Sequence, residues 1–91
     1  MAGKQHTVTP EAQELRAVFG RNLRETCKIA GLSLNALARD ANVSRSHMLQ
    51  VLHGNTNCSL DWLAQVAVVL AVEPWTLLVE TLPADEAADT E

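Results

Sequence analysis

The stretch over residues 34–52, LNALARDANVSRSHMLQVL, constrains the fold most, because it predicts two short helices joined by a tight turn. Ala38 stands where the helices must approach closely, and a larger side chain there forces them apart. Asn42 falls in the turn, where a left-handed backbone is needed and Gly or Asn tolerates it best. Ser44 offers a capping oxygen to the second helix. The residues expected to point inward are Leu37, Ala38, Val43, Met48 and Val51.

The rest of the chain predicts three more helices. Thr9-Pro10-Glu11 begins a long first helix with a capping hydroxyl, a proline and an acid. Gly31 ends this helix. Leu15 and Leu60 belong to apolar stripes with helical spacing, so we expect them in the core. We predict an all-α, five-helix domain over residues 9–82, between a flexible arm at 1–8 and an acidic, disordered tail at 83–91. Its helices are expected at residues 10–30, 34–41, 44–53 and 60–71, with a short fifth helix from residue 74.

The acidity of the chain is concentrated at its C-terminus. The net charge is −4, from seven Lys and Arg against eleven Asp and Glu. The last nine residues, PADEAADTE, carry four of the acids and no base, so residues 1–82 are neutral. Only Arg39 and Arg45 are basic beyond Lys28, which leaves a thin positive surface for an anionic partner.

Other functional classes find little support. No apolar run reaches the roughly 18 residues of a membrane span, and no basic-then-apolar leader begins the chain, so we expect a cytoplasmic protein without a membrane partner. Cys27 and Cys58 lie far apart, which indicates reduced, buried thiols. His47, His53 and Cys58 match no common zinc spacing, and HExxH, P-loop, GxGxxG and nucleophile-elbow motifs are absent. We expect no metal, no cofactor and no enzymatic activity.

Residues 34–52 have the small residue, the turn residue and the later apolar residues of a helix-turn-helix. Around them stand Phe19, Leu23 and Arg24 ahead of Gly31-Leu32-Ser33, then Gly54-Asn55 and the segment SLDWLAQVAVVLAVEPWTLL. On these features the chain, over about residues 15–81, resembles the phage-repressor (Cro/C1 or Xre-like) family of DNA-binding proteins. The resemblance implies that the third helix docks in the DNA major groove with its N-terminal end toward the base edges.

The resemblance also implies which residues contact DNA. By position on the third helix, the residues expected to read bases are Arg45, Ser46, Gln50 and, beside them, His47. An Arg can donate two hydrogen bonds to guanine, and a Gln can pair with adenine. The alternative is the solvated face of an ordinary helix. The candidates for phosphate contacts are Asn35, Ser44, His53, Asn55, Thr56, Asn57, Arg24 and Lys28.

Three positions depart from the family pattern. Leu34 stands where the family usually has a Gln that contacts DNA and braces the reading helix, which puts that contact in doubt. Cys27 and Leu52 replace an Arg and a Glu that commonly pair, so we expect them to pack together as apolar residues. The loop at residues 55–57, Asn-Thr-Asn, replaces the usual Lys or Arg, which predicts a shallower salt dependence of DNA binding.

The fourth and fifth helices carry more apolar side chains than one core requires. Trp62 and Trp75 are further candidates for exposure. We expect a twofold dimer built on the fifth helix, as in relatives of the family, with reading helices about 34 Å apart; a larger monomeric core is the alternative. The expected interface residues are Val68, Val69, Trp75, Leu78 and Val79.

These features favour a bacterial or phage transcriptional regulator, a dimeric repressor of a palindromic operator, with its own gene as a candidate target. The alternative is an antitoxin-like or adaptor module that binds a protein partner, with DNA binding weak or secondary. The scarcity of Lys and Arg after residue 28 favours this alternative. The acidic tail either repels DNA, which sharpens specificity, or aids solubility.

Overall fold

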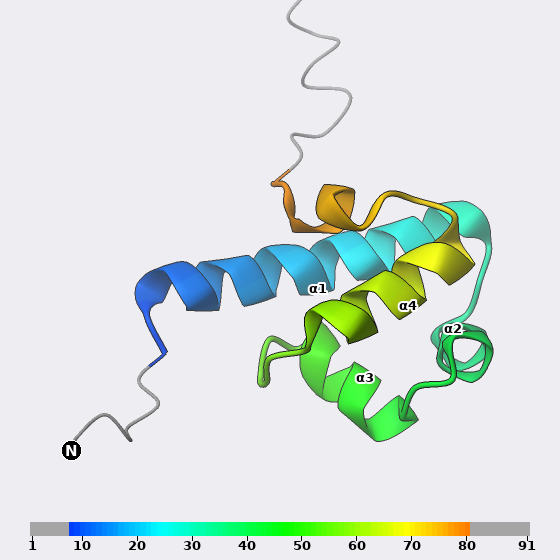
Figure 1. Ribbon diagram of the computed structural model, residues 1–91, viewed down its shortest axis with the longest axis horizontal. Helices are drawn as coiled ribbons and strands as arrows, with labels where there is room; N and C mark the ends of the chain where they lie inside the picture. Colours follow the sequence, from blue (N-terminus) through cyan, green and yellow to red (C-terminus); the bar gives the residue numbers. More distant parts are fainter. Residues whose placement is uncertain (1–7, 81–91) are drawn as a thin grey trace, which may run out of the picture.

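The computed structural model describes residues 8–80, which form helices joined by turns and short loops (Figure 1). This part contains four α-helices and one 3-10 helix: α1 (Pro10–Ala30), α2 (Leu34–Ala41), α3 (Arg45–Leu52), α4 (Leu60–Leu70) and η2 (Pro74–Leu78). The predicted all-α class is confirmed. The predicted arm lies outside the described residues except for Val8, and the predicted acidic tail lies outside them entirely. Among the described helices, none combines the length and the apolar character needed to span a bilayer.

The fifth element is a 3-10 helix of five residues rather than the α-helix that we predicted. The Thr76 N–H and hydroxyl both bond to the Glu73 carbonyl, at 3.0 and 2.6 Å. Beyond this turn, the Asn22 side chain in α1 donates to the Leu77 and Val79 carbonyls, at 3.0 and 2.8 Å. Because Asn22 of α1 supplies the hydrogen bonds for these carbonyls, the backbone is extended at Val79 and does not continue as a helix.

The helix ends follow from capping residues, of which Thr9, Ser44, Gly31 and Asn42 were predicted from the sequence. Each α-helix begins after a hydroxyl that accepts a hydrogen bond, at 3.0–3.1 Å, from the backbone N–H three residues later. These hydroxyls belong to Thr9, Ser33, Ser44 and Ser59. Each one satisfies an N–H that the first turn of a helix leaves unpaired. Residues in the left-handed conformation follow three of the α-helices: Gly31, Asn42 and Ala71.

Ala71 follows α4 with φ 60° and ψ 41°, a conformation that costs a residue with a side chain about 1–2 kcal/mol. The Ala71 side chain is exposed, so replacing it with hydrogen removes few packing contacts. We expect Ala71→Gly to raise the free energy of unfolding by about 0.5–1 kcal/mol, measured by urea denaturation. Ala64→Gly, at an exposed position inside α4, is the control and should lower it by a similar amount. A loss of stability in both variants would contradict the prediction.

One hydrophobic core joins all five elements. Its most deeply buried side chains come from each of them: Leu23, Leu37, Met48, Val66 and Leu77. Leu77 was not among the core residues that we predicted. Helix α1 lies against the inner side of α3, and a Cβ placed on Gly20 would stand 2.6 Å from the Leu52 carbonyl oxygen. The absence of a side chain at Gly20 therefore permits this close helix approach.

Two residues at the start of α4 differ from the prediction in their burial. Trp62 is 8% exposed, not exposed as expected, and packs edge-on against Phe19 with ring centroids 6.2 Å apart. Leu60, expected in the core, is 79% exposed. The buried side chains of α4 are Trp62, Leu63, Val66, Ala67 and Leu70. Leu60 lies at the edge of this face, in the first turn of α4, where the core does not cover it.

Leu15 is also exposed, at 47%, although its spacing predicted burial. It lies in the N-terminal part of α1, which extends beyond the other helices (Figure 1). Few side chains are therefore available to cover it.

Cys27 and Leu52 both lie in the core, 3% and 7% exposed, and their direct contact stays a prediction. Cys58 is half-buried, and both thiols are free. Burial raises the pKa of Cys27 and of Cys58, because it disfavours the charged thiolate. Both side chains are therefore neutral thiols near pH 7.

Candidate nucleic-acid interface

The two-helix unit at residues 34–52 has the geometry that its sequence predicted. Asn42 adopts φ 59° and ψ 46° in the turn. The Val43 N–H donates to the Ala38 carbonyl at 3.0 Å, and Ala38 is only 5% exposed. Helices α2 and α3 therefore form a helix-turn-helix, with α3 at the lower edge of the molecule in Figure 1.

Helix α3 separates its polar side chains from its apolar ones. Met48, Val51 and Leu52 are buried against the core. The predicted base-reading residues Arg45, Ser46 and Gln50 are exposed. These three side chains share the outward face of the helix and are open to a partner.

His47, the fourth predicted base-reading residue, has a different environment. It is half-buried, and its ring packs edge-on against Trp62 with centroids 5.4 Å apart. Its Nε2 lies 3.3 Å from the Asn57 carbonyl oxygen. His47 therefore joins α3 to α4 and to the segment between them, at the edge of the outward face.

Arg45, at the N-terminal end of α3, is held by a residue of α2. Its Nε donates a hydrogen bond to Oδ1 of Asn35. This contact leaves the two terminal nitrogens of the guanidinium available for another acceptor. Leu34, which cannot make the bracing contact usual for the family, is half-buried against the core. The contact that links α2 to α3 is thus made by Asn35, the residue after Leu34. The sequence alone did not predict the pairing of Asn35 with Arg45.

We expect Asn35→Ala to weaken specific DNA binding about two- to tenfold, because the Arg45 guanidinium loses a hydrogen bond that limits its orientations. Fluorescence anisotropy with a labelled duplex measures the change. In an Arg45→Ala background the same substitution should have a much smaller effect, since the two residues are coupled. Equal effects in both backgrounds would show that Asn35 acts independently of Arg45.

The predicted phosphate contacts lie on three parts of the fold. Asn35 and Ser44 stand at the N-terminal ends of α2 and α3, where unpaired N–H groups attract anions. A second group, His53, Asn55, Thr56 and Asn57, forms the segment after α3. Arg24 and Lys28 are exposed on α1.

Positive charge on this surface is sparse but unopposed on α3, which has no Asp or Glu. Arg39 pairs with Asp40 at 3.2 Å on the exposed side of α2. Arg45 is the one Lys or Arg on α3. Within the described residues, no group of three or more His, Cys, Asp or Glu side chains is arranged to hold a metal ion. The outward face of α3 is thus suited to bind a polyanion through hydrogen bonds.

The comparisons with known proteins agree with this geometry. The family described as "Helix-turn-helix domain" matches residues 18–77. The solved structure of the restriction-modification controller protein C.AhdI from Aeromonas hydrophila is 35% identical, covering 68% of this chain and 94% of that chain, with a TM-score of 0.65. The hypothetical transcription factor NHTF from Neisseria is 29% identical over 93% of this chain and 100% of that chain, with a TM-score of 0.70.

A chain of the SinR protein/SinI protein complex is 32% identical, covering 79% of this chain and 74% of that chain, with a TM-score of 0.65. Comparison with curated proteins finds no match. The family match contains all of α2 and α3 and extends from α1 into η2. The chain therefore belongs to the Cro/C1-type (Xre) helix-turn-helix family of DNA-binding transcriptional regulators.

Proposed function

We propose that this regulator binds a palindromic DNA operator as a homodimer and represses transcription from it in the cytoplasm, with its own gene as a candidate target. The observation that carries the proposal is the outward face of α3, which is free of acids and begins with a guanidinium held by Asn35. Such a face fits the major groove, where an α-helix can present side chains to base edges.

Each exposed residue of this face has a role in the proposal. Arg45 donates its terminal N–H groups to guanine O6 and N7, the commonest base-specific contact of an Arg. Gln50 pairs with adenine or turns to a neighbouring base, and Ser46 contacts either. His47 lies beside them and positions α3 through Trp62 and Asn57.

The proposed phosphate contacts frame this face. The N-terminal ends of α2 and α3, with Asn35 and Ser44, bind the backbone on one side, and the segment from His53 to Asn57 binds it on the other. Arg24 and Lys28 contribute charge from α1. Because the segment after α3 has few cations, the logarithm of the binding constant should fall less steeply with salt than in relatives with Lys or Arg there.

The proposed dimer uses the apolar side chains of α4 and η2. Val68, Trp75 and Val79 are 76%, 62% and 43% exposed, while Val69 and Leu78 are half-buried beside them. Ala64 and Ala71 are exposed on the same side of α4 as Val68. A twofold contact between two such surfaces would remove them from water and present two α3 helices to successive major grooves.

We expect Val68→Glu to prevent dimerisation, because the contact would bury an unpaired carboxylate in each protomer. Sedimentation equilibrium should then report the mass of one chain where the parent protein reports two. The fold should survive, since residue 68 is largely exposed in the single chain. Arg39→Glu, a charge change at an exposed position of α2, is the control. A Val68→Glu protein that still sediments as a dimer would place the interface elsewhere.

Selection of binding sites from a random duplex library tests the proposed operator. The expected consensus is an inverted repeat whose half-sites are about 34 Å, one DNA turn, apart. Footprinting on the selected duplex should protect both half-sites together. Recovery of unrelated sequences, with equal affinity for scrambled duplexes, would overturn sequence-specific binding.

A second candidate function is the binding of a protein partner, with DNA binding secondary. Two observations favour it: few cations follow residue 28, and one relative is a chain of a protein–protein complex. Arg45→Ala separates the two functions. It should abolish operator binding in the first case and leave capture of the partner unchanged in the second.

A further inference from the structure

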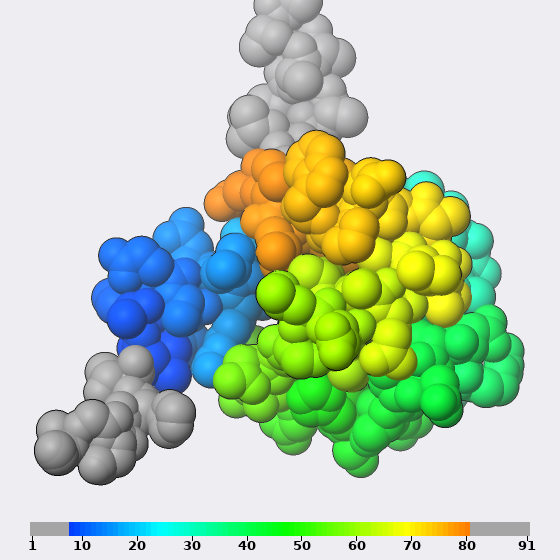
Figure 2. Space-filling model, viewed as in Figure 1, coloured from blue at the N-terminus to red at the C-terminus, as the bar shows by residue number. Residues whose placement is uncertain are grey.

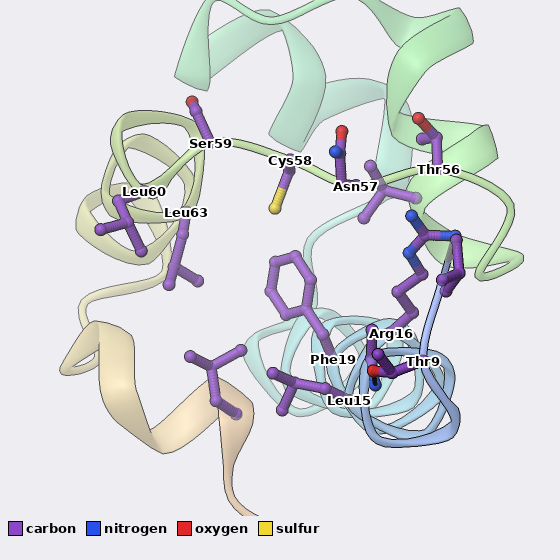
Figure 3. Close-up of a pocket in the computed structure, with 14 residues that line it drawn as sticks. Thr9, Leu15, Arg16, Phe19, Thr56, Asn57, Cys58, Ser59, Leu60 and Leu63 are labelled. Atoms are coloured by element: carbon purple, nitrogen blue, oxygen red, sulfur yellow. Dashed lines mark hydrogen bonds between the residues drawn. The ribbon is translucent and has the colours of Figure 1, made fainter. Parts of the chain in front are cut away.

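A groove lies between the N-terminal half of α1, the segment that leads into α4, and η2 (Figure 3). Its volume is 570 Å³, within the range of about 300–1,000 Å³ typical of small-molecule sites. None of the contacts proposed for bases lies in this groove. The groove is therefore distinct from the face proposed to read bases.

The side chains that line the groove are segregated by polarity. Figure 3 shows Arg16 and Thr9 of the α1 end on the same side as Thr56 and Asn57. The opposite side is formed by leucines of α4, and aromatic and aliphatic side chains of α1 lie between the two. These apolar residues are Leu15, Phe19, Leu60 and Leu63. The groove thus has one cationic, hydrogen-bonding side and one apolar side.

Arg16 sets the charge of the polar side. It is half-buried, and no carboxylate of residues 8–80 forms an ion pair with it. No Asp or Glu lines the groove. A cation partly withdrawn from water is stabilised by an anion that donors such as Thr9 and Thr56 can also bind.

The apolar side of the groove is also left open to solvent by the described residues. Leu15 is 47% exposed and Leu60 is 79% exposed, although helical spacing predicted both in the core. Phe19 forms the floor between them and is itself 4% exposed. An aliphatic chain laid from Arg16 toward Leu60 would cover both leucines and remove their surface from water.

We propose that this groove binds an amphipathic organic anion, a compound with one carboxylate and an aliphatic body. The carboxylate pairs with the Arg16 guanidinium, beside the Thr9 and Thr56 hydroxyls. The aliphatic body lies over Leu15 and Phe19 and ends against Leu60. This site shares no residue with the outward face of α3, although Thr56 and Asn57 also belong to the segment proposed to bind phosphates.

Isothermal titration of the full chain with decanoate tests the proposal. Saturable binding of one decanoate per chain is expected, with a raised Tm because the anion binds the folded state. Arg16→Gln should weaken the affinity about tenfold or more, as expected for loss of a charge-assisted contact. Arg21→Gln, which removes an exposed cation of the same helix that pairs with Glu80, should change it less than twofold.

Two further measurements identify the groove itself. Leu60→Glu places a carboxylate on the apolar side and should abolish decanoate binding without unfolding the protein, because this side chain is exposed. Decyltrimethylammonium, with the same tail and a cationic head, should not bind. Unchanged affinity in Arg16→Gln or in Leu60→Glu, equal binding of the cationic compound, or no saturable binding would each overturn the proposal.

Discussion

Arg45→Ala is expected to abolish sequence-specific binding by this protein. A guanidinium that contacts guanine O6 and N7 contributes about 1–3 kcal/mol of discrimination. In a dimer both half-sites lose it, so the loss is about 2–6 kcal/mol, or at least thirtyfold in affinity. Titration of the selected operator and of a scrambled duplex, at one fixed salt concentration, measures the change. The two affinities should become nearly equal, because the residual binding is to phosphates.

Arg39→Ala is the matched control, since it also removes one guanidinium from the helix-turn-helix. Arg39 is exposed on α2 and pairs with Asp40, and it makes no hydrogen bond to α3 within residues 8–80. Its loss should lower the affinity for the operator and for the scrambled duplex by the same small factor. If Arg39→Ala and Arg45→Ala reduced specificity equally, Arg45 would not be the main base-reading residue.

Gly20→Ala is expected to destabilise the fold although alanine favours a helix. The added Cβ would stand 2.6 Å from the Leu52 carbonyl oxygen and 3.2 Å from its carbon, both backbone atoms of α3. Helix α1 or α3 must therefore shift, and overpacking of this kind costs about 1–3 kcal/mol. Urea denaturation should show a lower midpoint with an unchanged slope.

Ala17→Gly calibrates this experiment, because it changes the same two residue types on the exposed side of α1. It should lower the free energy of unfolding by about 0.5–1 kcal/mol through helix propensity alone. Close packing at residue 20 is thus indicated if alanine gives a lower free energy of unfolding than glycine at residue 20 and a higher one at residue 17. A Gly20→Ala protein more stable than the parent would mean that the helices can separate without cost.

Local chemistry made most of the fold predictable. The capping hydroxyls, the glycine after α1 and the left-handed Asn42 each act on neighbouring backbone groups, so their effects can be read from adjacent residues. The faces of the helices were harder to predict. Leu60 and Trp62 are both apolar residues at the start of α4. The Trp62 ring is buried because it packs against Phe19 and His47, whose positions depend on the tertiary fold.

The same distinction applies to the candidate interface. The outward positions of Arg45, Ser46 and Gln50 follow from the helical repeat once Met48 and Val51 are assigned to the core. The bond from Arg45 to Asn35 depends on how α2 and α3 cross, which ten residues of separation in sequence do not specify. The end of η2 was unpredictable for the same reason, since it depends on Asn22 in the distant α1.

The walls of the groove have a thermodynamic consequence. Thr56 and Asn57 belong both to the groove and to the segment proposed to bind phosphates, and Leu78 belongs both to the groove and to the proposed dimer surface. If an occupant changes the affinity for DNA by some factor, DNA must change the affinity for the occupant by the same factor. Operator-bound protein would then hold or release such a compound differently from free protein, so the DNA itself would act as an effector of the groove.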